Sequence, residues 1–514
     1  MTVSLAAWDY IIVAVYLAAI VGISAWLALG QSTGREYFLA GRNMGGSTLA
    51  LSIMANQASA VSLVGAPAFV ALREGGGLRW LQYELALPLA MLVLIWLLLP
   101  AIRSAPGASI YGYAEARFGA GVRRALAASF LLSRGLALGV ILYASALVVG
   151  PAFGMRTSTA LVVVGIFCVA YTSLGGILAD IWSDVMQLAI LWVGTIIGGA
   201  FILWKNGAAV LHAIPVERTR TLVVDSLGIG DGNSFALAPM LVGGLFLYLS
   251  YYGCDQTQAQ RLLTARDDAS AQRALLLNGL LRFPLVLTYC AFGLLLAGLL
   301  QIDPAFAALM NGRAADDLVP TFLMAYLPSG FRGIMLAGIF AAAMSSIDSA
   351  LNSLAAVTLD DVFGMDAARQ SVWTGRWTSL FWGVFAIVSG LVFASNSRGV
   401  LELIGQVGSI FYGPVLGVFL LGAMTRHVRG RHALIALAIG LTANVLVAAF
   451  AKDVSWLWWN AIGCVATVMT ALLAAGRPVQ MHVARIPVRA GIILASAFVL
   501  MVTLLLIVGI VTSA

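Results

Sequence analysis

Long apolar runs constrain this chain more than any other feature of its sequence. Runs of about twenty or more apolar residues recur along all 514 positions, and only 10% of the residues are charged. Soluble domains carry about 25% charged residues. Runs of this length match helices that cross a bilayer, whereas transmembrane barrels show weak alternating segments of about ten residues. The sequence therefore predicts an all-α polytopic membrane protein.

We expect about fourteen transmembrane helices. Their predicted ranges are 8–28, 47–70, 80–102, 124–151, 157–177, 180–204, 236–258, 274–301, 331–362, 374–395, 400–424, 432–450, 456–474 and 488–512. The first run follows a segment without Lys or Arg, which indicates a true span and not a cleaved signal peptide. The loops after odd-numbered spans hold most of the arginines, as cytoplasmic loops do. We predict a multi-pass protein of the cell membrane, plasma or inner, with its N-terminus outside.

Several classes of function have no motif in this sequence. The four cysteines share no CxxC spacing and the four histidines form no HExxH, so we find no metalloenzyme motif and no disulfide framework. No GxxxxGK[ST] occurs, which argues against transport driven by ATP within this chain. A channel is a rival interpretation, but no TVGYG-like filter occurs. The net charge of +7 belongs to the loops and does not indicate nucleic acid. We expect a transporter and not an enzyme.

The most informative stretch is AAAMSSIDSALNSLAAVTLDDVF at 341–363. On a helix, Ser345, Ser346 and Ser349 share one face with Ala342. Hydroxyl and carboxylate oxygens suit a hard cation, not zinc or copper. Small residues also let membrane helices pack closely, and this alternative explains the Ser and Ala positions equally well. Asp348 favours a binding site, because a buried carboxylate is costly and packing does not require one.

Two predicted spans carry interruptions. The span 47–70 combines polar residues with helix breakers, namely Asn56, Gln57, Ser62, Gly65 and Pro67. The span 236–258 does the same with Gly243, Gly244, Tyr248, Tyr251, Gly253 and Asp255. Broken helices expose backbone carbonyls that transporters use to hold ions and substrates, and two broken spans five apart indicate an inverted five-plus-five repeat. The alternatives are an ordinary Pro-kinked helix and, for the tyrosines, a membrane-interface belt.

Four further charges lie inside predicted spans: Glu84, Arg134, Asp184 and Arg282. Charges this deep pair with one another or line a wet cavity. A structural pair of Glu84 with Arg134 or with Arg282 is one interpretation of each arginine. Two arginines beside one acid leave a positive charge over, which favours an anionic or carboxylate-bearing substrate because Arg binds carboxylates bidentately.

The motifs YFLAGRNMGG (37–46), GGILADIWSDVMQ (175–187), YGCDQTQAQRLLTA (252–265) and AAAMSSIDSALNS resemble the sodium:solute symporter family. Its branch for iodide, monocarboxylates and vitamins is the most similar in these motifs. The resemblance implies a LeuT-type fold with an inverted repeat and broken helices. It divides the chain into a first extra helix (1–30), repeat one (47–204), repeat two (236–424) and additional helices (432–514).

The resemblance also implies sodium as the coupling ion. A central sodium site would take backbone carbonyls and two hydroxyls from the second and ninth spans, namely Ala55, Ala58, Ala342, Ser345 and Ser346. A second sodium, present in some members, would lie closer to the cytoplasm with Asp184, Ser345, Asp348 and Ser349. Asp348 departs from the family, where Ser, Thr or a small residue is common, and makes this site more negative.

For the substrate, the resemblance together with the intramembrane charges implicates Gln57, Ser62, Tyr83, Glu84, Arg134, Tyr248, Tyr251 and Arg282. Val61 and Ser62 stand where sugar carriers have Glu-Gln, and Arg282 stands where they have Lys. The first departure argues against a sugar, and the second favours a carboxylate, because Arg is the better carboxylate partner. We therefore expect a secondary active symporter that couples inward sodium flow to uptake of a small organic solute, an anion or carboxylate, by alternating access. The alternatives are a sodium- or proton-coupled carrier of a zwitterionic amino acid or of a sugar or polyol. The sequence predicts no oligomeric state.

Overall fold

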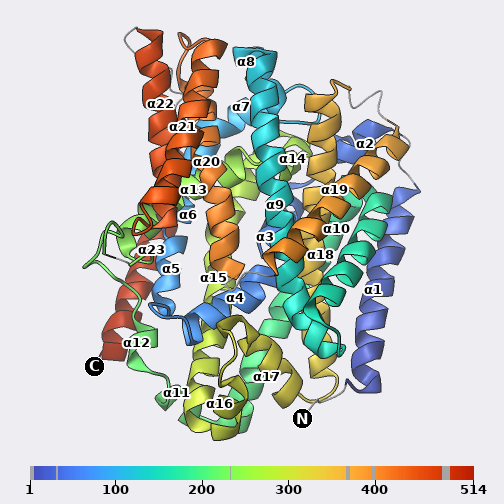
Figure 1. Ribbon diagram of the computed structural model, residues 1–514, viewed down its shortest axis with the longest axis vertical. Helices are drawn as coiled ribbons and strands as arrows, with labels where there is room; N and C mark the ends of the chain where they lie inside the picture. The colour runs from blue at the N-terminus through green and yellow to red at the C-terminus, as the bar shows by residue number, and fades with distance from the viewer. Residues whose placement is uncertain are drawn as a thin grey trace.

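The computed structural model describes residues 5–29, 33–58, 60–231, 233–365, 371–394, 400–476 and 487–513. These residues form helices and contain no β-strand, only isolated bridges such as Met44 with Ala265. Figure 1 shows most of the long helices running along the long axis of the molecule. The prediction of an all-helical membrane protein is confirmed at this level.

The helices of the first half are α1 (Ala7–Ala28), α2 (Gly34–Leu39), α3 (Gly46–Gln57), α4 (Ala60–Ala71), α5 (Leu81–Glu84), α6 (Ala86–Val93), α7 (Leu99–Arg103), α8 (Tyr111–Phe118), α9 (Ala120–Ala152), α10 (Thr157–Asn206), α11 (Ala209–His212) and α12 (Val216–Thr219). Those of the second half are α13 (Gly244–Gly253), α14 (Gln256–Leu263), α15 (Asp268–Ile302), α16 (Pro304–Met310), α17 (Leu318–Tyr326), α18 (Phe331–Val357), α19 (Val372–Phe393), α20 (Val400–Met424), α21 (Gly430–Phe450), α22 (Trp456–Ala475) and α23 (Val488–Ser513).

Within these described residues, 11 helices are long and apolar enough to cross a membrane, or 12 spans if the bent pair of α3 and α4 counts as one. The predicted spans 157–177 and 180–204 correspond to α10, which is broken at Gly176 into Thr157–Thr172, shorter than a full span, and the span Gly176–Asn206. The predicted span 236–258 consists mainly of a π-helical turn at Pro239–Gly243 and the short helix α13. The count of about fourteen, the inverted repeat and the domain boundaries stay predictions.

Breaks in three membrane helices shape the interior. The axes of α3 and α4 are bent by 58°, and Ala58 at the end of α3 leaves helical geometry with ψ of 66°. The helix α13 ends at Gly253, and α14 begins after Asp255, whose backbone is extended. Both of these breaks follow the sequence prediction. The third lies within α10 at Gly176, which adopts a φ of 60°, a left-handed value that glycine tolerates without a Cβ clash.

The most buried elements are also rich in polar side chains. The most apolar part of the α18 span is 94% buried inside the protein, whereas that of the α23 span is 17% buried. The short helix α14 has the sequence QTQAQRLL, and all of its residues are buried. Several of its polar groups find partners: Gln260, for example, donates to the carbonyl oxygen of Phe38 at 2.8 Å and accepts from Ser353 at 2.8 Å. A polar core of this kind requires a functional explanation, because apolar side chains would pack at lower desolvation cost.

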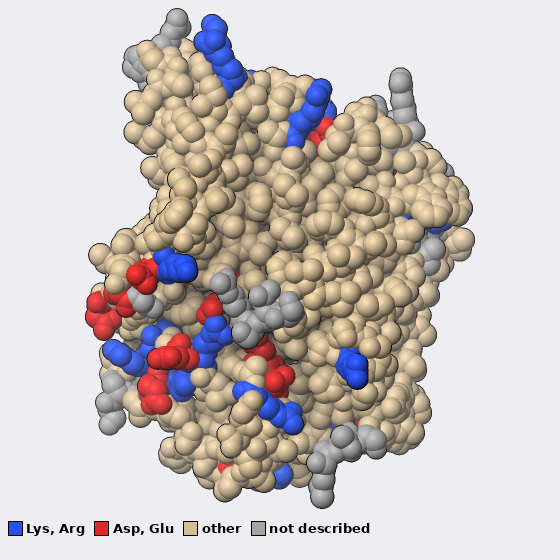
Figure 2. All heavy atoms as spheres, viewed as in Figure 1, with Lys and Arg blue, Asp and Glu red and all other residues tan. Residues whose placement is uncertain are grey.

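Charged side chains on the visible face leave a broad uncharged band. Figure 2 shows a mixed group of acids and bases in the lower part of the molecule and a few charged side chains, mostly bases, near the top. Figure 1 places the start of α1 and the helix α8 at opposite ends. The predicted topology requires this separation of the N-terminus from the arginine-rich segment around α8. Which end faces the cytoplasm stays a prediction.

Candidate functional site

A cavity of about 160 Å³ lies at the break between α3 and α4. Side chains from α9, α13, α15, α18 and α20 are also among those that line it. Six of the eight predicted substrate residues line it: Gln57, Ser62, Tyr83, Arg134, Tyr251 and Arg282. Glu84 and Tyr248 do not line it. Ser346, predicted for the central sodium site, also faces this cavity, so the structure brings the two predicted sites together at the α3–α4 break.

Glu84 and Tyr248 lie behind Arg282. The Nε atom of Arg282 is 3.2 Å from a carboxylate oxygen of Glu84, and the Tyr248 hydroxyl donates to the other oxygen at 3.0 Å. The carboxylate is fully buried, accepts a hydrogen bond from Tyr248 and forms an ion pair with Arg282. It therefore orients the guanidinium at the cavity wall, and of the two pairs considered for Glu84 the structure contains the one with Arg282.

Arg134 pairs with Asp255, a carboxylate that was not among the four further charges predicted to lie inside the membrane. The closest nitrogen-to-oxygen distance between them is 3.9 Å, and the Arg134 guanidinium lies 5.7 Å from the centre of the Tyr251 ring. Asp255 also caps α14, since its carboxylate accepts from the backbone N–H of Thr257 at 2.8 Å. The expectation of one positive charge left over is therefore wrong: two arginines face two carboxylates. The signal was present in the sequence, because Asp255 lies inside the predicted span 236–258.

Charges are nevertheless distributed unevenly around the cavity. Of the described residues that line it, Arg134 and Arg282 are charged, and none is Asp or Glu. The remaining polar wall consists of amides and hydroxyls, such as those of Gln57 and Ser62. Guanidinium groups thus face the space, while Glu84 and Asp255 stand behind them. Such a wall can bind an anion, because no carboxylate in the described lining would repel it.

The predicted central sodium residues lie where α18 passes the end of α3. The Ser346 hydroxyl donates to the carbonyl oxygen of Asn56 at 3.1 Å, one of the last carbonyls of α3. The last turn of a helix leaves carbonyl oxygens without partners within that helix. Ala55, Ala58 and Ala342 are buried in the same core. Hydroxyl and carbonyl oxygens are ligands of hard cations, so the chemistry of these residues fits sodium.

The four residues predicted for a second sodium do not form one cluster in the structure: Asp348 contacts a different residue from the other three. The Ser345 hydroxyl donates to Asp184, and Ser349 is joined to Asp180, whose carboxylate accepts from it at 2.9 Å. Asp348 takes no part in this cluster and instead accepts from the hydroxyl of Thr172. Whether these residues bind sodium stays a prediction.

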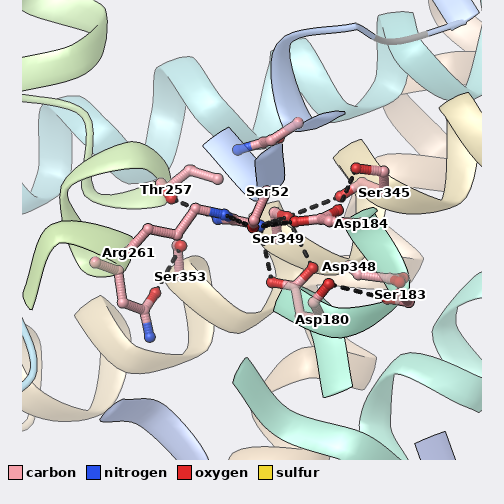
Figure 3. Close-up of polar contacts among 12 residues, drawn as sticks. Ser52, Asp180, Ser183, Asp184, Thr257, Arg261, Ser345, Asp348, Ser349 and Ser353 are labelled. Carbon is pink, nitrogen blue, oxygen red and sulfur yellow. Dashed lines mark hydrogen bonds and ion pairs between the residues drawn. The ribbon is translucent and has the colours of Figure 1, made fainter. Parts of the chain in front are cut away.

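The guanidinium of Arg261 occupies the centre of this cluster (Figure 3). It lies 2.7 Å from Asp184 and 3.2 Å from Asp180. It also donates to the Ser52 hydroxyl at 2.7 Å and to the carbonyl oxygen of Thr257 at 2.8 Å. The side chain is fully buried. Arg261 therefore supplies the positive charge that two adjacent buried carboxylates require.

Arg261 and Asp180 were absent from the predicted site. Asp180 stands four residues before Asp184, so the helical spacing places both carboxylates on one face. Arg261 lies inside the motif YGCDQTQAQRLLTA, in a segment outside the predicted spans. Because α14 is short and polar, no apolar periodicity marked it as buried.

A broken membrane helix, a cavity at the break and oxygen ligands beside it are the features of a secondary transporter. The model of the sodium:solute symporter family matches residues 37–440, and the chain belongs to this family. It is therefore a sodium-coupled symporter of solutes and not an enzyme, as the resemblance implied.

Several relatives support the assignment. The chain is 29% identical to the sodium-coupled monocarboxylate transporter 2 of Bos taurus, over 86% of this chain and 72% of that one. It is 28% identical to the sodium/iodide cotransporter of Homo sapiens, over 86% and 70%. It is 25% identical to the sodium/sialic acid symporter NanT of Aliivibrio fischeri, over 91% and 92%. A solved structure of a Na+-coupled sialic acid symporter in a substrate-bound outward-open state shares the fold, with a TM-score of 0.80 at 23% identity over 93% of this chain and 99% of that one.

Proposed function

We propose that this symporter takes up a small organic anion, in the simplest case a carboxylate, together with sodium. The observation that carries the proposal is the wall of the central cavity, which presents Arg134 and Arg282 and, among its described lining residues, no carboxylate. A guanidinium binds a carboxylate through two parallel hydrogen bonds, which gives both strength and orientation. The cavity volume of about 160 Å³ favours a small solute.

The charge balance around the cavity also supports an anion. Arg282 with Glu84 and Arg134 with Asp255 are each neutral as pairs. A monoanion would bring one uncompensated negative charge into this low-dielectric space, and a sodium ion at the neighbouring α3 break would cancel it. Each of the two would then bind better when the other is present, which is the coupling that a symporter needs. Monocarboxylates and iodide, after which two of the relatives are named, are anions.

The sodium residues proposed for this coupling are those that the resemblance implied. The carbonyls of Ala55, Ala58 and Ala342 and the hydroxyls of Ser345 and Ser346 would hold the central ion and so tie α3 to α18. Asp184, Ser345, Asp348 and Ser349 are the residues proposed for a second ion. A monoanion cancels the charge of one sodium ion, so a second sodium ion is needed for one net charge to cross the membrane. One net charge moved through about 100 mV provides about 2.3 kcal/mol, which corresponds to roughly fifty-fold accumulation.

The test is sodium-dependent thermal stabilisation of the purified protein with a panel of small carboxylates, sugars and zwitterionic amino acids. We expect a shift with sodium and not with potassium, and a further shift with one carboxylate. Arg282→Gln should abolish the carboxylate shift and leave the sodium shift in place. A further shift with a neutral sugar alone, unaffected by Arg282→Gln, would contradict the anion proposal and make Arg282 a purely structural partner of Glu84.

A further inference from the structure

A second, much smaller cavity lies at the break of α10 and is separate from the substrate cavity. Its volume is about 10 Å³, about the space of one water molecule. Tyr171, Thr172 and Gly176 line it from the break itself, and Asp348 and Asn352 line it from α18. A break in a helix leaves carbonyl oxygens of the preceding turn without their usual partners. The cavity therefore combines a carboxylate with a locally opened backbone.

Polar groups that line this cavity lack partners. One carboxylate oxygen of Asp348, the hydroxyl of Tyr171 and both amide atoms of Asn352 have no hydrogen-bond partner among the described residues. All three side chains are at most 4% exposed. Buried polar groups without partners are rare and costly, and each of them calls for an explanation such as a missing water or ion.

The other oxygen of Asp348 is only partly satisfied. It lies against the hydroxyl of Thr172, but the same hydroxyl is also 2.7 Å from the carbonyl oxygen of Cys168, four residues earlier in α10. A hydroxyl has one proton to donate. Thr172 therefore cannot serve both acceptors fully, and Asp348 is short of donors on both of its oxygens.

The balance of local charges also favours a cation beside Asp348. Asp180, Asp184 and Asp348 contribute three carboxylates, and Arg261 contributes the one guanidinium that pairs with the first two. No ion pair of Asp348 occurs within the part of the chain that the structure describes. An unpaired carboxylate at this depth requires a positive partner, because its desolvation is otherwise uncompensated.

We propose that Asp348 is the carboxylate ligand of a separate sodium site at the α10 break, with Asn352, Thr172 and Tyr171 as further oxygen donors. All the donors are hard oxygens, which suit sodium. A single dehydrated ion fits a space of this size, and one ion would neutralise Asp348 and engage several unpartnered oxygens together. The site shares α18 with the central site but takes its other ligands from α10 instead of α3, and it includes a carboxylate. It also separates Asp348 from the second-ion set around Asp184, where Arg261 already lies against the carboxylate. It does not depend on the nature of the substrate.

The experiment counts sodium ions bound to the purified full-length protein at saturation, with radioactive sodium and no substrate. We expect Asp348→Asn to bind one ion fewer than the wild type. Ser346→Ala should lose an ion from the central site, so the double variant should lose both. An Asp348→Asn protein that binds as many ions as the wild type would overturn the proposal, and would mean that a proton or a water occupies the cavity.

A matched pair of threonines on α10 provides the second arm, which applies even if Asp348→Asn fails to fold. Thr172 and Thr195 are both buried and both donate to the carbonyl four residues earlier, but only Thr172 contacts Asp348. We expect Thr172→Val to weaken the binding of one sodium ion by about tenfold or more, and Thr195→Val to leave sodium binding unchanged. Equal sodium affinities in the two valine variants would overturn the site.

Discussion

Arg261 provides the sharpest test of the interior electrostatics. Substituting Gln for Arg261 removes the positive charge between Asp180 and Asp184, which lie 3.2 Å and 2.7 Å from its guanidinium. It also removes the donor to the Ser52 hydroxyl. Because all of these groups are buried, water cannot take over the role of the guanidinium.

The expected cost follows from the buried carboxylates that remain. Removing one partner of a buried ion pair costs about 3–5 kcal/mol, because the other partner is left as an uncompensated charge. Arg261 serves two carboxylates, so we expect the free energy of unfolding to fall by an amount at the upper end of this range. Arg261→Lys keeps the charge but cannot reproduce the several directed N–H donors, and should fall between Gln and the wild type.

The assay is the unfolding midpoint of the purified protein in sodium-free buffer. Arg266→Gln is the matched control, because Arg266 pairs with Asp267 at 3.4 Å on the exposed surface, where such pairs contribute at most about 1 kcal/mol. Adding Asp180→Asn to Arg261→Gln should recover part of the loss, since it removes one of the two unpaired charges. An Arg261→Gln protein that unfolds at the wild-type midpoint would refute the reasoning.

Three further predictions concern the substrate cavity and its surroundings. Arg282→Lys keeps the charge beside Glu84 but loses the bidentate fork, so radiotracer uptake should show a KM for the carboxylate raised by about tenfold or more, and an unchanged KM would contradict direct contact. Gly244→Ala places a Cβ 2.9 Å from ring carbons of Tyr83, which should cost about 1–3 kcal/mol of stability through overpacking; an unchanged unfolding midpoint would show that the ring moves freely. Arg73→Gln breaks a partly exposed ion pair with Glu402 and should lower stability by no more than about 1 kcal/mol, so a larger loss in the same unfolding assay would contradict a surface role.

Local chemistry made much of the site predictable. The oxygen-rich face of 341–363 and the breaks at 47–70 and 236–258 depend on neighbouring residues along one helix. Gln57, Ser62, Tyr83, Arg134, Tyr251 and Arg282 accordingly line one cavity in the structure. The family motifs added the sodium coupling, which the family assignment confirms.

The partners of the buried charges could not be predicted in the same way. Asp255 beside Arg134 and Arg261 between Asp180 and Asp184 are contacts between segments far apart in the chain. Ser345 and Asp184, for example, are separated by 161 residues. Which acid meets which base depends on how helices pack, and a count of charges per span does not contain that information.

The sequence by itself determined that this chain is a helical membrane protein, where its helices break, and which residues carry oxygen ligands. These properties follow from hydropathy, helix-breaking residues and side-chain chemistry, all of which act within one segment. Only the tertiary structure decided that Arg261 occupies the acidic cluster and that Asp348 faces the break at Gly176. The physical reason is that a buried charge is stabilised by whichever opposite charge or dipole the packing brings within a few ångströms, and that distance is a property of the whole fold.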